Sequence, residues 1–255
     1  MTPNYTDILY TVSDQVCTIA INRPQKLNAM TGQTIRELED AIRRASESKD
    51  SGVVVLTGVG EKAFCAGGDV KWEADGGLED LDFRINRMLV DCPKPTVARV
   101  NGYAIASGNH IAYFCDLTIA ADHAIFGQNG PRVGSPASGH LVSHLADIVG
   151  HKRAREMWLL CGRYSADKML DWGLVNAVVP MADLDAEVRR WCDQLLAVSP
   201  TCQKLLKKSF QGIMDWTPMK EIIDRHAPGY FASGEQQEGA AAFLEKRKPD
   251  FSRWR

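Results

Sequence analysis

Short apolar runs separated by helical patterns characterise the first half of the chain. Runs typical of strands occur at Ile8–Val12, Val16–Ile21, Val53–Leu56, Thr96–Val100 and Leu117–Ala121. Apolar residues recur with helical spacing in Thr31–Ser48 and Leu81–Val90, so helices are expected between the strands. Strands that alternate with helices in this order predict a parallel sheet with helices on its faces, which is an α/β fold.

The pattern becomes helical throughout the second half, after about residue 140. Segments with helical spacing follow one another with short loops between them: Leu141–Val149, Arg153–Cys161, Ala166–Trp172, Leu184–Ala197, Thr201–Trp216, Glu221–Ala232 and Glu235–Lys246. No repeat or linker separates the two halves. We therefore expect the helical half to pack on the sheet or on a neighbouring subunit.

Composition limits the partners and the setting rather than the fold. The 255 residues carry a formal net charge of −2, which gives no reason to expect nucleic acid or a membrane as a partner. No apolar run approaches the ~20 residues that cross a bilayer, and the first residues lack the layout of a signal peptide. The seven cysteines lack metal-binding spacing, which favours free thiols in the cytoplasm. Cys65 is expected to be a buried thiol, with a catalytic cysteine as the alternative.

Two glycine-containing segments follow predicted strands and are candidate binding loops. Ala63–Asp69 comes after the strand that begins at Val53, where open α/β sheets place their ligands. Its spacing excludes a phosphate loop, and a structural turn is the alternative interpretation. Asn101–His110 follows the strand Thr96–Val100 and runs into an apolar helical segment. A helix N-terminus offers unpaired N–H groups, so the two loops could each supply one donor to an oxyanion.

The motifs around these loops resemble one enzyme family over essentially the whole chain. They are Asn22-Arg23-Pro24, Lys26–Met30, Phe64–Asp69, Asn101-Gly102-Tyr103, Cys115-Asp116-Leu117, Gly173–Asn176 and Val179-Pro180. As a set they are similar to the crotonase (enoyl-CoA hydratase/isomerase) superfamily. The resemblance implies a crotonase-type ββα spiral over residues 1–195 and a helical C-terminal trimerisation region over residues 196–255.

The resemblance also implies the ligand and the assembly. An acyl-CoA thioester would be the substrate, with coenzyme A as part of it, no separate cofactor and no metal. The subunits would form a homotrimer or homohexamer. By the family pattern, the backbone N–H groups of Gly68 and Ser107 would form the oxyanion hole. A serine at the second position need not destroy the hole, because the donor belongs to the backbone.

Two branches of the superfamily look most similar to this chain. Phe126-Gly127-Gln128, Gly130–Ser135 and Glu245–Phe251 look like dihydroxynaphthoyl-CoA synthase and equally like 2-ketocyclohexanecarboxyl-CoA hydrolase. The chain differs from other members of the superfamily at the positions of their catalytic carboxylates. His110 and Gly130 stand where enoyl-CoA hydratases carry their two glutamates, and Ala137 stands where the naphthoate synthases carry an aspartate.

Histidine remains as the group for proton transfer, because imidazole titrates near neutral pH. His110 takes the position of a catalytic glutamate, and packing beneath the oxyanion turn with a bond to a backbone carbonyl is its alternative role. His140 lies where a loop leads into a helix and is expected in the site. Ser135 either donates a hydrogen bond to substrate or caps the following helix.

Residues for binding the thioester are suggested by their place beside these loops. Arg23 and Lys26 are candidates for the coenzyme A phosphates, and Lys246 and Lys248 for those of a neighbouring subunit, with solvated surface charges as the alternative. The remaining candidates line the loops themselves: Ala66, Asp69, Trp72, Gln128 and Gly130. Asp69 alternatively fixes its own turn, and Trp72 alternatively packs in the core.

These observations lead to one principal hypothesis and two alternatives. The first is an enzyme that stabilises a thioester enolate and opens a cyclic β-keto acyl-CoA by hydrolytic carbon–carbon cleavage. The second is an enoyl-CoA hydratase or isomerase whose acid/base is not glutamate. The third is a catalytically silent subunit that binds coenzyme A.

Overall fold

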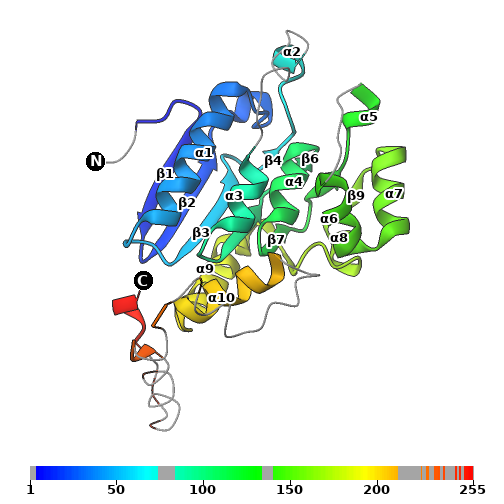
Figure 1. Ribbon diagram of the computed structural model, residues 1–255. Coiled ribbons are helices and arrows are strands. Elements are labelled where there is room, and N and C mark those ends of the chain that lie inside the picture. Colours follow the sequence, from blue (N-terminus) through cyan, green and yellow to red (C-terminus); the bar gives the residue numbers. More distant parts are fainter. Residues whose placement is uncertain are drawn as a thin grey trace.

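The chain folds as successive turns that each contribute a strand to a large sheet, a short strand to a small sheet, and a helix. The computed structural model describes residues 4–73, 84–133 and 140–211, and beyond them residues 225, 228–229, 233–235, 238, 245, 247 and 250–254. Two complete turns are visible: β3-β4 followed by α3, and β5-β6 followed by α4. This arrangement is the predicted crotonase-type ββα spiral (Figure 1).

The large sheet has the strand order β1-β2-β3-β5-β7-β10. β1 and β2 form an antiparallel hairpin, and every later strand is parallel to its neighbour. The strands are β1 (Ile8–Ser13), β2 (Val16–Ile21), β3 (Val53–Gly58), β5 (Thr96–Val100), β7 (Leu117–Ala121) and β10 (Ala177–Val179). The parallel pairing of the central strands agrees with the apolar runs of the sequence.

The small sheet has the order β4-β6-β8-β9 and was not expected as a separate sheet. Its strands have two or three residues each: β4 (Ala63–Cys65), β6 (Tyr103–Ile105), β8 (Ile125–Gly127) and β9 (Tyr164–Ser165). β4, β6 and β8 are parallel, so the chain leaves all three at the same edge. Both candidate loops follow strands of this sheet.

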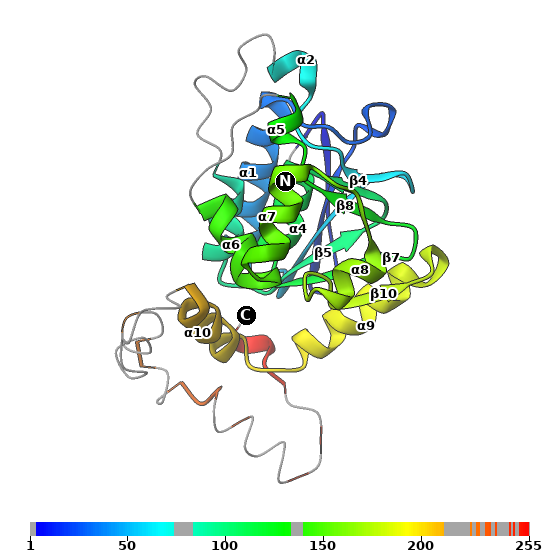
Figure 2. The ribbon, with the colours of Figure 1, turned by 90° about the vertical axis from the view of Figure 1, so that its right-hand side faces the viewer.

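The helices cover the large sheet on both faces. In chain order they are α1 (Gly32–Glu47), α2 (Val70–Trp72), α3 (Ile85–Asp91), α4 (Ser107–Phe114), α5 (Gly130–Val133), α6 (His140–Val149), α7 (His151–Leu160), α8 (Ala166–Asp171), α9 (Leu184–Leu196) and α10 (Pro200–Gln211). Short 3-10 turns lie at η1 (Pro24–Lys26), η3 (Met181–Asp183) and η5 (Ser252–Trp254). Figure 1 shows α1, α3 and α4 on one side of the large sheet, and Figure 2 shows α9 on the other.

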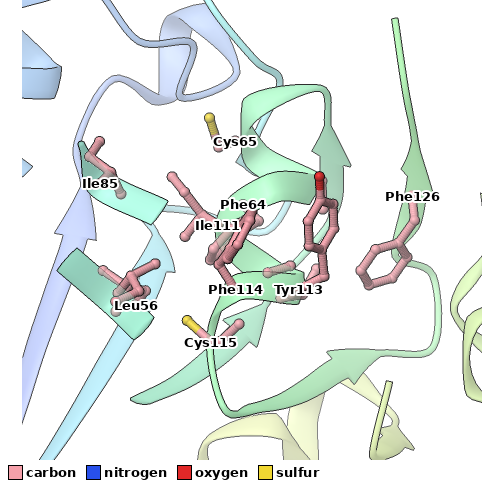
Figure 3. Close-up of a cluster of buried hydrophobic side chains, with 14 of the residues drawn as sticks. Leu56, Phe64, Cys65, Ile85, Ile111, Tyr113, Phe114, Cys115 and Phe126 are labelled. Atoms are coloured by element: carbon pink, nitrogen blue, oxygen red, sulfur yellow. The ribbon is translucent and has the colours of Figure 1, made fainter. Parts of the chain in front are cut away.

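The core is divided by the large sheet, as the alternation along β3 requires. Val54 and Leu56 belong to the main cluster beneath α1, α3 and α4, whereas Val53 and Val55 pack against α9. Successive side chains of a strand point to opposite faces, so an apolar strand buried on both sides serves both clusters. In Figure 3, Phe64, Ile111 and Phe114 of the main cluster lie close together between β4 and α4.

The sequence-based expectations differ from the structure in a few segments. The candidate loop Ala63–Asp69 begins with the strand β4 and is followed at once by α2, and the helix expected from Leu81 is described from Ile85 as α3. The helices expected at Glu221–Ala232 and Glu235–Lys246 lie largely outside the described residues. Among the described helices, none is long and apolar enough to cross a membrane.

Candidate active site

The first candidate loop leaves β4 and turns sharply at two glycines. Gly67 has a φ of 104°, a left-handed conformation that strongly favours glycine. The Gly67 carbonyl accepts from the Met30 N–H at 2.8 Å, and the Asp69 N–H donates to the Met30 carbonyl at 2.8 Å. These two bonds anchor both sides of Gly68 to the chain beside α1.

The second candidate loop is a tight connection from β6 to α4. Ala106 links them with φ 50° and ψ −120°, a conformation unusual for any residue except glycine. Its N–H donates to the Gly127 carbonyl at 2.9 Å, and its carbonyl accepts from the His110 N–H at 2.9 Å. Ser107 is the first residue of α4, so its N–H points out of the helix N-terminus without an intrahelical partner.

The two loops are in direct contact. A methyl group on Gly67 would lie 3.1 Å from the Ala106 Cβ, and one on Gly108 would lie 2.0 Å from the Cys65 carbonyl oxygen. Glycine at 108 therefore permits the N-terminus of α4 to approach the backbone of β4. Figure 3 shows Cys65 and Ile111 near this junction of β4 and α4.

Gly68 and Ser107 are the candidate donors of an oxyanion hole. Within the described part of the chain, neither residue's N–H has a hydrogen-bond partner. Both residues are partly exposed, whereas Gly67 and Gly108 beside them are buried. Two unpaired backbone donors at the same edge of the small sheet can bind an oxygen that gains negative charge, and each such donor is worth ~3 kcal/mol in a transition state.

Two buried asparagines hold the backbone that leads into the first loop. Asn28 Nδ2 donates to the Ala63 carbonyl at 2.7 Å and the Val59 carbonyl at 3.1 Å. Asn101 Nδ2 donates to the Gly58 carbonyl at 2.8 Å. These side chains bind carbonyls at the end of β3, at Val59 and at the first residue of β4, which fixes the start of β4.

His110 is buried at the beginning of α4, with 8% of its surface exposed. Its Nε2 lies 3.0 Å from Gln128 Oε1, and its ring lies 5.5 Å from the Trp158 ring and 5.6 Å from the Tyr113 ring. Burial lowers the pKa of His110 to about 4, although the bond to Gln128 opposes part of this shift. The imidazole is therefore neutral at pH 7 and bonded to a side-chain amide rather than to a backbone carbonyl.

A neutral buried His110 makes stability depend on pH. Because its pKa falls from 6.5 to about 4 on folding, the unfolded chain binds a proton below pH 6.5 that the native state does not. The free energy of unfolding should fall by about 2 kcal/mol through this group between about pH 7.5 and about pH 5. Urea unfolding at the two pH values would measure the loss.

A matched pair of variants isolates the contribution of His110. Between the same two pH values, the free energy of unfolding of His110→Gln should fall by about 2 kcal/mol less than that of the parent. His123→Gln, which replaces a histidine whose side chain is 46% exposed, should keep the parent's pH dependence. Equal losses in the parent and in His110→Gln would contradict the assignment of a neutral, buried imidazole.

Gln128 occupies the other side of the His110 contact. Its side chain is fully buried, and among the described residues its Nε2 has no hydrogen-bond partner. Gly130 begins α5 immediately beyond it. Of these two candidates, it is Gln128 whose side chain bonds to His110.

Arg23 and Asp69 bind each other and the chain around them. Arg23 Nη2 lies 3.5 Å from Asp69 Oδ2, its Nε lies 3.6 Å from Asp7 Oδ2, and its Nη1 donates to the Ala29 carbonyl. Asp69 Oδ1 also accepts from the Lys71 N–H at 3.2 Å and the Trp72 N–H at 3.4 Å. Asp69 thus fixes its own turn, as the alternative interpretation predicted, and the Arg23 guanidinium is engaged inside the protein.

The remaining described candidates surround the first loop. Ala66 is partly buried, and its N–H donates to the Leu27 carbonyl at 3.1 Å. Lys26 is exposed at the end of η1. Trp72 packs against the main core, and a methyl group on Gly32 would lie 3.3 Å from its Cζ2.

Cys65 is a packing residue. It is completely buried, and burial raises the pKa of its thiol to about 12. A neutral thiol at pH 7 is a weak nucleophile, so the buried interpretation is the one that the structure favours.

Several predicted site residues cannot be placed. Ser135, Lys246 and Lys248 lie outside the described residues, as does the side chain of His140. Across the part of the chain that is described, no group of three His, Cys, Asp or Glu residues is arranged to hold a metal ion.

Sequence reasoning missed Glu73, which follows α2. A methyl group on Gly68 would lie 1.8 Å from Glu73 Oε1 and 2.8 Å from its Cδ, so the carboxylate lies against Gly68. The Glu73 N–H donates to the Asp69 carbonyl at 2.9 Å, a helical bond that brings residue 73 back over the loop. That i to i+4 spacing from Asp69 is the sequence signal that could have located it.

Comparison with known proteins agrees with the fold and the motifs. The sequence matches the Enoyl-CoA hydratase/isomerase family over residues 11–253. A solved enoyl-CoA hydratase from Bacillus anthracis is 27% identical with a TM-score of 0.88, covering 97% of this chain and 99% of that one. An enoyl-CoA hydratase subunit from Geobacillus kaustophilus is 33% identical with a TM-score of 0.85, covering 97% and 98%. One from Mycobacterium smegmatis is 30% identical with a TM-score of 0.84, covering 96% and 99%.

The family match spans nearly the full length, and the structural likeness to the Bacillus anthracis protein covers 97% of this chain. The chain therefore belongs to the enoyl-CoA hydratase/isomerase family, the crotonase superfamily of acyl-CoA enzymes.

Proposed function

We propose that this protein stabilises a thioester enolate and hydrolyses a carbon–carbon bond of a cyclic β-keto acyl-CoA. The observation that carries the proposal is the pair of unpaired N–H groups at Gly68 and Ser107 in a chain without the two hydratase glutamates. The position of the first is taken by the neutral, buried His110, and that of the second by Gly130. Donors for the thioester oxygen are thus kept while the pair that activates water for hydration is replaced.

The chemistry balances with water as the only co-reactant. Water adds to the ring ketone, and the bond between the ketone carbon and the thioester α-carbon breaks. The electron pair of that bond passes into the thioester as an enolate, whose oxygen the Gly68 and Ser107 N–H groups bind. A proton then returns to the α-carbon. The former ketone carbon becomes a carboxylic acid at the other end of the opened chain.

Hydration or isomerisation of an enoyl-CoA is the second candidate, because the solved relatives are described as enoyl-CoA hydratases. Incubating the purified protein with a six-membered cyclic β-keto acyl-CoA and, separately, with crotonyl-CoA distinguishes the two. Formation of a dicarboxylic mono-thioester from the ring substrate supports the proposal. Turnover of crotonyl-CoA alone would overturn it in favour of hydration. Binding of both thioesters without turnover of either would instead identify a silent coenzyme A-binding subunit.

We further propose that residues 196–255 mediate assembly into a homotrimer or homohexamer in the cytoplasm. The support comes from α10, where Leu206 is 57% exposed and Phe210 is 73% exposed in the single chain. Large apolar side chains in such a position are typical of subunit contacts. The seven free cysteines support a reducing compartment. Light scattering coupled to size exclusion would measure the number of subunits.

A further inference from the structure

Glu73 presents a carboxylate at the oxyanion hole that the motifs do not account for. Its Oε1 is so close to Gly68 that a methyl group at that position would fit only if the Glu73 carboxylate moved aside. Gly68 does not have the positive φ of Gly67, so its contact with the Glu73 carboxylate, and not its backbone conformation, is what a larger residue at 68 would disturb. Glu73 and Gly68 are both partly buried, so neither residue is sealed in the core.

The position suits proton transfer at the α-carbon of a thioester. An oxygen bound by the Gly68 N–H would lie within ~3 Å of that nitrogen. The α-carbon is two covalent bonds from this oxygen. Glu73 Oε1 is in contact with Gly68, the residue that binds the oxygen. A general base must be within hydrogen-bond reach of the proton it moves, and the contact with Gly68 is what makes Glu73 the candidate for this position.

The other acid/base groups near the loops are less suited to the task. Asp69 is committed to Arg23 and to the N–H groups of α2. His110 is buried and bonded to Gln128, and burial lowers its pKa to about 4. Its imidazole is therefore a weak base at neutral pH.

We propose that Glu73 transfers the α-proton of the acyl-CoA thioester held by Gly68 and Ser107. This inference rests on the proposed enolate chemistry and extends it to a further catalytic residue. In enolate formation, the Cα–H bond breaks, an O–H bond forms on Glu73, and the electron pair moves to the thioester oxygen. In the ring-opening reaction, Glu73 takes an O–H proton from the hydrated ring ketone as the carbon–carbon bond breaks, and then returns this proton to the α-carbon of the enolate.

Charge favours this assignment. Carboxylate and enolate would repel each other at such short range if both were ionised. Proton transfer to Glu73 neutralises the carboxylate as negative charge appears on the thioester oxygen. The site therefore carries one negative charge at each stage, which the two N–H donors stabilise when it reaches the oxygen.

Exchange of the α-protons of butyryl-CoA in D₂O tests the role of Glu73 without requiring the natural substrate. Exchange by the parent, followed by NMR, is the expected result. Glu73→Gln should lower the exchange rate by about 10²-fold or more, while the affinity for butyryl-CoA by calorimetry changes by less than about threefold. The matched control is Glu61→Gln, an exposed glutamate before β4, which should exchange at the parent's rate.

A second variant separates chemistry from structure. Glu73→Ala leaves space beside Gly68, and added formate should restore part of its exchange if a carboxylate is the missing group. Exchange at the parent's rate in Glu73→Gln would overturn the role of Glu73 and leave the proposed function standing. Loss of exchange in Glu73→Ala with no recovery in formate, together with weakened thioester binding, would also overturn it. Absence of exchange in the parent with every acyl-CoA would overturn the enolate chemistry itself.

Discussion

Replacing Gly108 by alanine is expected to lower acyl-CoA turnover by about 10²–10³-fold, the usual effect of losing an oxyanion donor. The added methyl group would lie 2.0 Å from the Cys65 carbonyl oxygen and 2.8 Å from its carbonyl carbon. Both are backbone atoms of β4, so no side-chain rotation relieves the clash. Either α4 must move away from β4 or the loop containing Gly68 must shift, and each movement separates the two N–H donors.

The effect should be seen in kcat or in the α-proton exchange rate, with the native fold retained by circular dichroism. Ala106→Gly is the control, because it makes the reverse change only two residues away. Ala106 has a φ of 50°, so glycine there should raise the free energy of unfolding by up to about 1 kcal/mol and preserve turnover. If Gly108→Ala remained within about threefold of the parent, the close contact of the two loops would not be what positions the donors.

The pattern of the sequence predicts the large sheet well because its strands are buried on both faces. Val53–Leu56 is apolar throughout, and the structure shows that alternate residues serve two separate cores. The small sheet could not be predicted in the same way. β4 and β9 have only three and two residues, too few to show a period, and both are defined by pairing with strands far along the chain.

The candidate site was predictable where a motif locates a backbone donor. It was less predictable where the environment of a side chain determines its protonation and its contacts. Gly68 and Ser107 were located by motif, and the structure places them at one edge of the small sheet. The environment of His110 depends on Gln128 and on Trp158 from α7, and no local pattern places these beside it. Glu73 contacts Gly68 because the chain turns at Asp69, and the i to i+4 spacing from Asp69 is the one local signal of this contact.

Replacing Lys207 by methionine is expected to lower the free energy of unfolding by about 3 kcal/mol. Lys207 lies on α10, and only 8% of its surface is exposed. Its Nζ donates to the Lys94 carbonyl at 3.0 Å, to the Leu89 carbonyl at 3.3 Å and to the Asp116 carboxylate. One ammonium thus joins α10 to the end of α3 and to the segments before β5 and β7. We take the lower part of the range for broken ion pairs because 33% of the Asp116 side chain is exposed.

Methionine keeps most of the apolar stem of Lys207, so the loss reports the ammonium rather than a cavity. Urea unfolding should show a lower midpoint with an unchanged slope. Lys152→Met, the same change at an exposed lysine of α7, should alter stability by less than about 0.5 kcal/mol. The double variant Lys207→Met with Asp116→Asn should lose less than the sum of the two single variants, because it leaves no uncompensated carboxylate. A Lys207→Met protein as stable as the parent would show that α10 is held by its apolar contacts and that the ammonium contributes nothing measurable.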